Sequence, residues 1–180
     1  AMVAAAFSGL NPGNSMTNKA LRIRGLEVEP KVTVDTDLLI ASGVMTTTKT
    51  TTGYRVARAI TTWLTDTRYN RVEVSCGVAT DFTARTVRDA LSVYLGAKNS
   101  PQTKFAALSR TETVLRGLAM PEPEGPGVLV GDANSPAYRN LAAEIEGDVM
   151  RIAFECSPVI PNNFILISIT ATPYSSSSIN

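Results

Sequence analysis

A short run near the end of the chain, residues 164–169, constrains the fold more than any other feature, because it is apolar on both faces of an extended strand. Successive side chains of a strand point to opposite sides. One face would carry Ile165, Ile167 and Ile169, and the other Phe164 and Leu166. Such a strand belongs inside a sheet that is covered on both sides, and left exposed it would promote aggregation.

Two prolines, Pro158 and Pro161, precede this run and predict an extended tether, because the residue before a proline avoids helical backbone. A segment placed in this way can leave its own body and enter the sheet of a neighbouring molecule. An ordinary last strand within its own chain is the alternative, and it remains open. We expect a body over residues 1–161 and a C-terminal arm over residues 162–180, in which an arm strand, residues 162–172, precedes a disordered tail.

The body mixes helical and strand patterns, which predicts an α/β fold with a mixed sheet flanked by helices. Residues 82–95 form an amphipathic helical pattern, and a shorter helix is expected over residues 35–42. Ser100 followed by Pro101 is an N-cap with proline at the first helical position, so a further helix should run to about Ala119. Its apolar face would carry Phe105, Leu108, Leu115 and Leu118.

Strand patterns fall into two hairpins. Residues 44–52 and 54–60 predict the first, joined near a Thr-Thr-Thr-Gly turn. Residues 141–145 and 149–156 predict the second, around a Glu-Gly-Asp turn. Residues 72–79 alternate like a strand but directly precede a helical pattern, and for them we favour a helix.

The sequence offers few of the arrangements that enzyme chemistry uses. The chain has no histidine, which removes the commonest general base and the commonest metal ligand. The glycine-rich run at 125–132 lacks the Lys-Ser/Thr ending of a phosphate loop, and the acidic residues are too scattered for a calcium or magnesium site. Cys76 and Cys156 fit two reduced, inert thiols. We therefore expect no catalytic residue, no cofactor, no metal and no enzymatic activity.

Charge and hydropathy point to surfaces that other proteins cover. The 17 basic and 16 acidic residues give a net charge of +1, which does not favour nucleic acid or an acidic membrane as a partner. No apolar run is long enough for a membrane span. Hydrophobic residues make up 44% of the chain and charged residues only 18%. A building block of a larger assembly is the expected class of protein.

Several stretches, in order along the chain, resemble the C-terminal portion of a bacteriophage contractile-tail sheath protein. The most diagnostic is the ending, a strand followed by Pro-x-x-Pro-x-Asn-Phe-Ile and another strand. A helix followed by a Gly-x-Lys turn, residues 85–98, is also similar to such sheaths. The other stretches are Ala4–Leu10 with Ser15–Lys19, Leu38–Met45 and Tyr54–Trp63. Because a full sheath protein would already be under way before this point, the chain is expected to be a fragment of a longer one.

The resemblance implies a subunit that packs in helical rings around a rigid tail tube and is linked to its neighbours by terminal arms that add strands to a shared sheet. It implies Arg85 and Arg88 as tube contacts, with solvated helix arginines as the alternative. Its partners would be other copies of the subunit, the tail tube protein, and baseplate and tail terminator proteins. The protein would be made in the bacterial cytoplasm and reside in the virion tail. The intersubunit strand would comprise Phe164, Ile165, Leu166, Ile167 and Ile169, with Pro158 and Pro161 as its tether.

Two other classes of protein stay open at this stage. A tube, terminator or baseplate protein could share the habit of donating a strand. A small hydrolase with a site based on Asp or Ser is the other alternative, and the absence of histidine argues against it.

Overall fold

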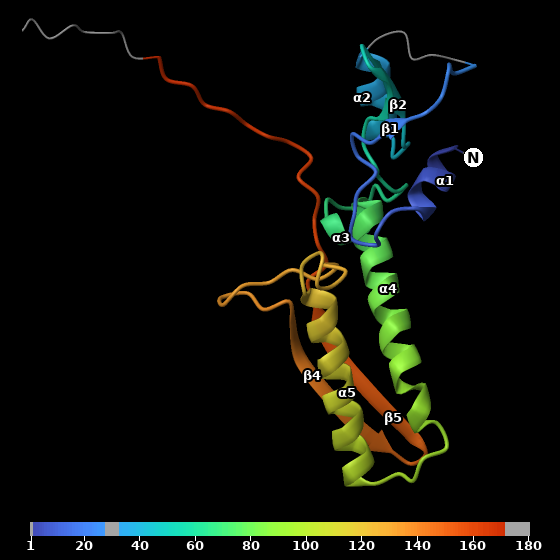
Figure 1. The fold of residues 1–180 in the computed structure, drawn as a ribbon, viewed down its shortest axis with the longest axis vertical. Coiled ribbons are helices and arrows are strands. Elements are labelled where there is room, and N and C mark those ends of the chain that lie inside the picture. Colours follow the sequence, from blue (N-terminus) through green and yellow to red (C-terminus); the bar gives the residue numbers. More distant parts are fainter. Residues whose placement is uncertain (1, 28–32, 172–180) are drawn as a thin grey trace, which may run out of the picture.

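The computed structural model describes residues 2–27 and 33–171, and it confirms a fold built from helices and β-structure. The β-structure forms two antiparallel sheets, one with strand order β1-β3-β2 and one made of β4 and β5. Figure 1 shows these as two parts of an elongated body. The elements are α1 (Met2–Ser8), β1 (Ala20–Leu21), α2 (Thr33–Ala41), β2 (Thr47–Thr50), β3 (Gly53–Val56), α3 (Tyr69–Val72), α4 (Val74–Leu91), a 3₁₀ turn (Ser92–Tyr94), α5 (Pro101–Ala119), β4 (Tyr138–Glu146) and β5 (Val149–Cys156).

The first part is organised around the three-stranded sheet. The expected hairpin is present as β2 and β3, which pair from Thr47↔Val56 to Thr50↔Gly53, so both strands are shorter than the sequence pattern indicated. Tyr54 and Val56 alternate into the interior, as the period of two in a strand requires. They belong to a buried cluster with Met16, Leu21 and Ala59.

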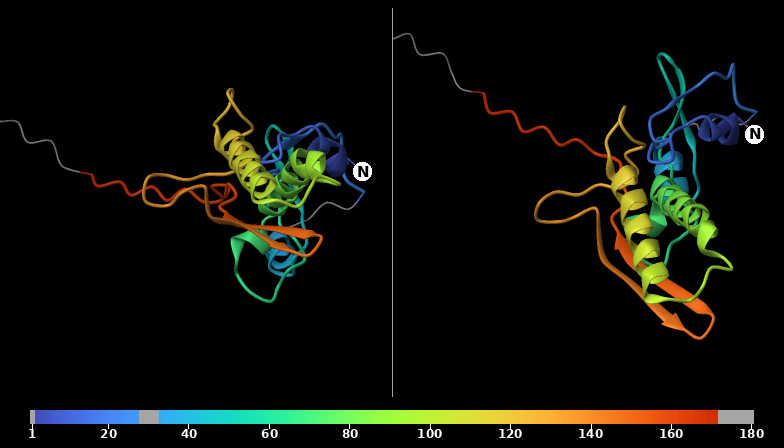
Figure 2. Two further views of the ribbon diagram at one scale, coloured as in Figure 1. Left: turned by 90° about the horizontal axis from the view of Figure 1, so that it is seen from below. Right: turned by 60° about the horizontal axis from the view of Figure 1, so that its bottom comes forward.

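In the second part, α4 and α5 lie side by side against one face of the β4–β5 hairpin (Figures 1 and 2). The helical interpretation of residues 72–79 is confirmed from Val74 onward. The N-cap of α5 is also confirmed, because the side chain of Ser100 accepts a hydrogen bond from the Thr103 amide at 3.2 Å. The buried stripe of α5 carries Ala107, Thr111, Leu115 and Leu118.

One residue of the expected apolar face of α5 is placed wrongly by the sequence pattern. Phe105 is 74% exposed. The contact face of α5 passes through Ala107 and Thr111, both fully buried, and it does not extend to Phe105. Small residues at these positions allow α4 and α5 to approach closely.

The second hairpin matches its expected turn. Gly147 adopts a positive φ of 61°, which a glycine accommodates without steric cost. The register pairs Ile145 with Met150 and Ala143 with Ile152, and it shifts between Arg139 and Ala142. Inward-facing, half-buried side chains of β5 face the helices, namely Met150, Ile152, Phe154 and Cys156.

Candidate interface: the C-terminal arm and its root

The arm leaves the body as an extended segment that pairs with no strand among the described residues. Both further views show residues 164–171 running away from the helices and sheets (Figure 2). The five large apolar side chains of the run are between 78 and 97% exposed. The alternative, an ordinary last strand within its own chain, is therefore not formed over residues 162–171.

The two prolines of the expected tether lie in a segment that is bound to the body. Pro158 forms an antiparallel bridge with Leu129, and the Val159 amide donates to the carbonyl of Val128 at 3.0 Å. Pro161 is half-buried. The exposed part of the arm consequently begins after these prolines and not at them.

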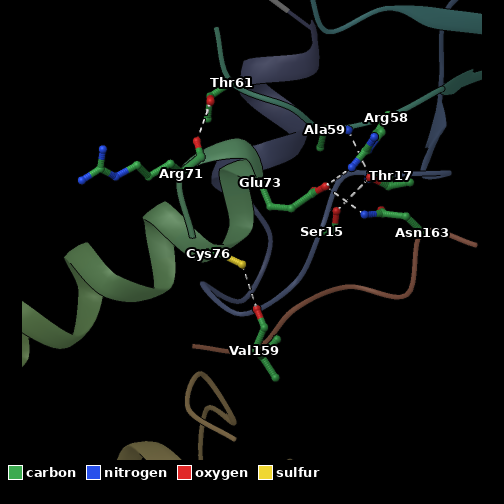
Figure 3. Close-up of polar contacts among 10 residues, drawn as sticks. All are labelled: Ser15, Thr17, Arg58, Ala59, Thr61, Arg71, Glu73, Cys76, Val159 and Asn163. Carbon is green, nitrogen blue, oxygen red and sulfur yellow. Dashed lines mark hydrogen bonds and ion pairs between the residues drawn. The ribbon is translucent and has the colours of Figure 1, made fainter. Parts of the chain in front are cut away.

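The arm is held at its root by a partly buried polar cluster of three residues, Arg58, Glu73 and Asn163, which we call the root cluster (Figure 3). Glu73 lies directly before α4 and its side chain is fully buried. Its Oε1 atom accepts hydrogen bonds from Arg58 Nη2 and from Asn163 Nδ2, both at 2.8 Å. The guanidinium of Arg58 also lies 5.7 Å from the ring centroid of Phe164.

Local backbone pairing explains why Glu73 is held at this point. Ile60 and Glu73 form an isolated antiparallel bridge, and the Thr61 amide donates to the carbonyl of Val72 at 2.8 Å. The Val74 amide donates to the carbonyl of Ala59. The residues after β3 and the start of α4 are thus tied together, and this brings Arg58 beside Glu73.

A second contact ties the same end of α4 to the segment that leads into the arm. The Sγ atom of Cys76 donates to the carbonyl oxygen of Val159 at 3.3 Å (Figure 3). Burial raises the pKa of the Cys76 thiol, and the neighbouring Glu73 carboxylate raises it further. A protonated thiol is the form that can donate this hydrogen bond.

Two apolar hollows lie beside the β4–β5 hairpin. A groove of about 360 Å³ runs between α4 and β5, and a second hollow of about 430 Å³ continues it toward the start of α5. Both are lined by Leu91, Leu95, Met150 and Ile152. The outer edge of β5 carries no strand partner within residues 2–27 and 33–171.

The two candidate tube contacts lie on α4, away from the root cluster. The side chain of Arg85 is 75% exposed and forms a loose ion pair with Asp81 at 4.0 Å. Arg88 is exposed and lines the groove beside β5. The structure therefore does not bring the two arginines together with the arm.

Residues 2–27 and 33–171 carry neither a metal-binding cluster nor a membrane-spanning helix. No group of His, Cys, Asp or Glu that could hold a metal ion occurs there. No helix of that part of the chain is long and apolar enough to cross a membrane. Cys76 and Cys156 are both free thiols.

The root cluster is the feature that sequence reasoning missed. Glu73, Arg58 and Asn163 are far apart along the chain, and no motif joins them. The one available signal was the asparagine that follows the second proline, within the Pro-x-x-Pro-x-Asn-Phe-Ile ending.

Comparison with known proteins finds similar structures. No protein-family model and no curated protein matches the sequence. A chain in the cryo-EM structure of the anti-feeding prophage baseplate matches with a TM-score of 0.77 and 18% identity, over 95% of this chain and 48% of that one. A chain of the anti-feeding prophage helical sheath in its contracted state matches with a TM-score of 0.74 and 17% identity, over 94% and 48%.

This chain thus spans about half the length of the chains it matches. At identities below one fifth, the likeness concerns the fold. The resemblance to a contractile-tail sheath that the sequence suggested is confirmed at that level: this fold also occurs in a prophage baseplate and in a helical sheath in its contracted state.

Proposed function

We propose that this chain is the C-terminal part of a structural subunit of a contractile tail sheath, and that its arm links neighbouring subunits by entering their sheets. The observation that carries the proposal is the exposed, two-faced apolar run at residues 164–169. Exposing large apolar side chains to water is unfavourable, so such a run favours a partner that covers it. Because both of its faces are apolar, the partner site has to enclose it on both sides. The fold shared with a helical sheath in its contracted state supports the same reading.

The energetics favour a durable link. Burying one large apolar side chain contributes about 1.5 to 3 kcal/mol, and the run carries five of them. Backbone hydrogen bonds to the accepting strand add to this. Part of this gain is offset by the cost of ordering the arm.

The acceptor that fits best is the outer edge of β5 on a second copy. An antiparallel pair of strands with free edges can accept a further strand. Alternate side chains of the added strand would cover the groove next to Met150 and Ile152. The other face of the added strand would point outward and would have to be covered by a further subunit. In a lattice of subunits, each subunit can bury the exposed strand face of its neighbour.

Contraction then follows from assembly alone and requires no enzymatic activity. Subunits assemble in an extended lattice and relax to one with better burial when the baseplate triggers them. The partners are other copies of the subunit, the tail tube protein, and baseplate and terminator proteins, in a tail built in the bacterial host and carried by the virion. Arg85 and Arg88 are the proposed contacts with the tube.

Deletion of residues 162–180 in the full-length protein tests the proposal. We expect soluble subunits that form no cylinders by negative-stain electron microscopy. Deletion of residues 173–180 alone, which spares the apolar run, is the control and should leave assembly intact. Cylinders of normal length from the longer deletion would refute strand donation as the link.

A baseplate protein is the second candidate, because a baseplate chain matches this fold as well as a sheath chain does. The full-length protein alone separates the two. We expect a sheath subunit to assemble into wide, hollow cylinders when purified, and a baseplate subunit to form no such cylinders.

A further inference from the structure

We propose that Glu73 is a positioning residue for strand donation. Together with Arg58 it clamps Asn163, so that the arm leaves the body at a fixed point and moves freely only beyond Phe164. This inference rests on the proposed function for its purpose, although the clamp itself is a property of the single chain.

The burial of Glu73 makes the clamp strong. Its side chain has no solvent exposure, and a carboxylate removed from water is stable only when it is paired and hydrogen-bonded. One of its two donors, Asn163, belongs to the arm. The Oε2 atom is buried and has no hydrogen-bond partner among the described residues, so the carboxylate depends on what Oε1 accepts.

Arg58 ties the next arm residue to the same site. Its guanidinium pairs with Glu73 and also lies over the ring of Phe164. The positive charge of the guanidinium is attracted to the face of the aromatic ring. Contacts end immediately afterwards, since Ile165 is 81% and Leu166 is 97% exposed. The clamp therefore marks the boundary between fixed and free chain.

A fixed root lowers the cost of donation. When a neighbour binds the arm, the chain up to Asn163 is already ordered, so less conformational entropy is lost. It also fixes the point from which the arm reaches the adjacent subunit. A tether that was flexible from Pro158 onward would search a much larger volume.

The test measures arm position in the soluble, unassembled full-length protein. Probes are introduced as unnatural amino acids at Gln102 on α5 and at Ile165, the first residue after Phe164, both exposed, and the distribution of distances between the two probes is recorded. Asn163→Ala removes one donor and is expected to broaden the distribution several-fold. Asn162→Ala, at the exposed neighbouring position, is the matched control and should leave it narrow.

A charge swap separates positioning from general stability. Asn163→Asp alone places a second carboxylate beside Glu73 and should release the arm. In the double variant Glu73→Gln with Asn163→Asp, position 73 supplies the amide and position 163 the carboxylate, which also gives Arg58 an acidic partner. The narrow distribution of probe distances should therefore return. A double variant as broad as Asn163→Asp would overturn the assignment, as would a narrow distribution in Asn163→Ala.

Assembly supplies the second readout. Asn163→Ala should raise the critical concentration for cylinder formation about tenfold or more. Losing one hydrogen bond to a charged group weakens association by a factor of this size. An unchanged critical concentration would contradict a positioning role. If the arm deletion left assembly intact, the proposed function would fail, whereas the distance distribution would still decide whether the clamp exists.

Discussion

The thiol of Cys76 donates a hydrogen bond to the carbonyl oxygen of Val159, which joins the first turn of α4 to the segment that leads into the arm. Cys76 is fully buried, and that burial raises the pKa of its thiol. A thiol in this state is a poor nucleophile because the thiolate is the reactive form.

Cys76 should therefore resist modification in the native protein. In a Cys156→Ser background, a thiol reagent such as DTNB at pH 8 should react with Cys76 only after denaturant is added. Complete reaction of the native protein within the mixing time would show that the start of α4 opens readily.

Core packing of α5 gives a second prediction. Leu115 is fully buried in the cluster beneath α4 and α5, so Leu115→Ala should lower the free energy of unfolding by about 2 to 5 kcal/mol. Leu95→Ala, at a side chain that is 84% exposed, is the control and should change it by less than about 0.5 kcal/mol. Urea denaturation followed by circular dichroism measures both.

A pair of glycines provides a third test. A Cβ atom at Gly131 would lie 2.1 Å from the backbone nitrogen of Ala137, so Gly131→Ala should destabilise the protein by about 1 to 3 kcal/mol. At Gly77, inside α4, a Cβ atom meets nothing within 4 Å. Gly77→Ala should therefore stabilise the protein by about 0.5 to 1 kcal/mol, and equal effects at the two sites would contradict the geometry of the loop that follows Gly131.

The β4–β5 hairpin should contain a small acid-sensitive contribution. Hydrogen bonds from Asn140 and then Arg139 lower the pKa of Glu155. The pKa of Glu155 is lower in the folded protein than in the unfolded chain. The ionised carboxylate therefore stabilises the fold at pH values above the usual pKa of a glutamate, and this stabilisation is lost as the pH falls through the lowered pKa.

Glu155→Gln should accordingly lower the melting temperature at pH 7 and have no effect once the pH is below that lowered pKa. Thermal melts of both proteins between neutral and acidic pH record the difference. The effect should be small because the site is exposed. A difference that stayed constant with pH would exclude an ionic origin.

The tube contact rests on the proposed function and can be tested directly. Reversing both charges, Arg85→Glu with Arg88→Glu, should weaken co-assembly with purified tube. Arg110→Glu, at an exposed position of α5, is the control. Unchanged co-assembly of the double variant would dispose of the assignment.

Elements with strong local signals could be predicted from the sequence. The N-cap at Ser100 and the glycine turn at Gly147 each decide the backbone within a few residues, and both are present as expected. The helical pattern over residues 82–95 was recognised for the same reason, although α4 starts eight residues earlier and ends at Leu91.

Features set by distant contacts could not be predicted. The two-residue strand β1 exists only because it pairs with β3. The burial of Glu73 depends on donors from Arg58 and Asn163, and nothing in its local sequence distinguishes it from a surface glutamate. Likewise, the contact face of α5 passes through Ala107 and Thr111 and leaves Phe105 exposed, and a pattern of large apolar residues does not mark that face.

The attachment of the arm to the start of α4 also determines how a mechanical load enters the molecule. A neighbour that pulls on the arm pulls on one end of a helix of 18 residues, about 27 Å long. Arg85 and Arg88 lie toward the other end of that helix. In the proposed function, tension between subunits would therefore enter the body at the end of α4 that lies opposite these arginines.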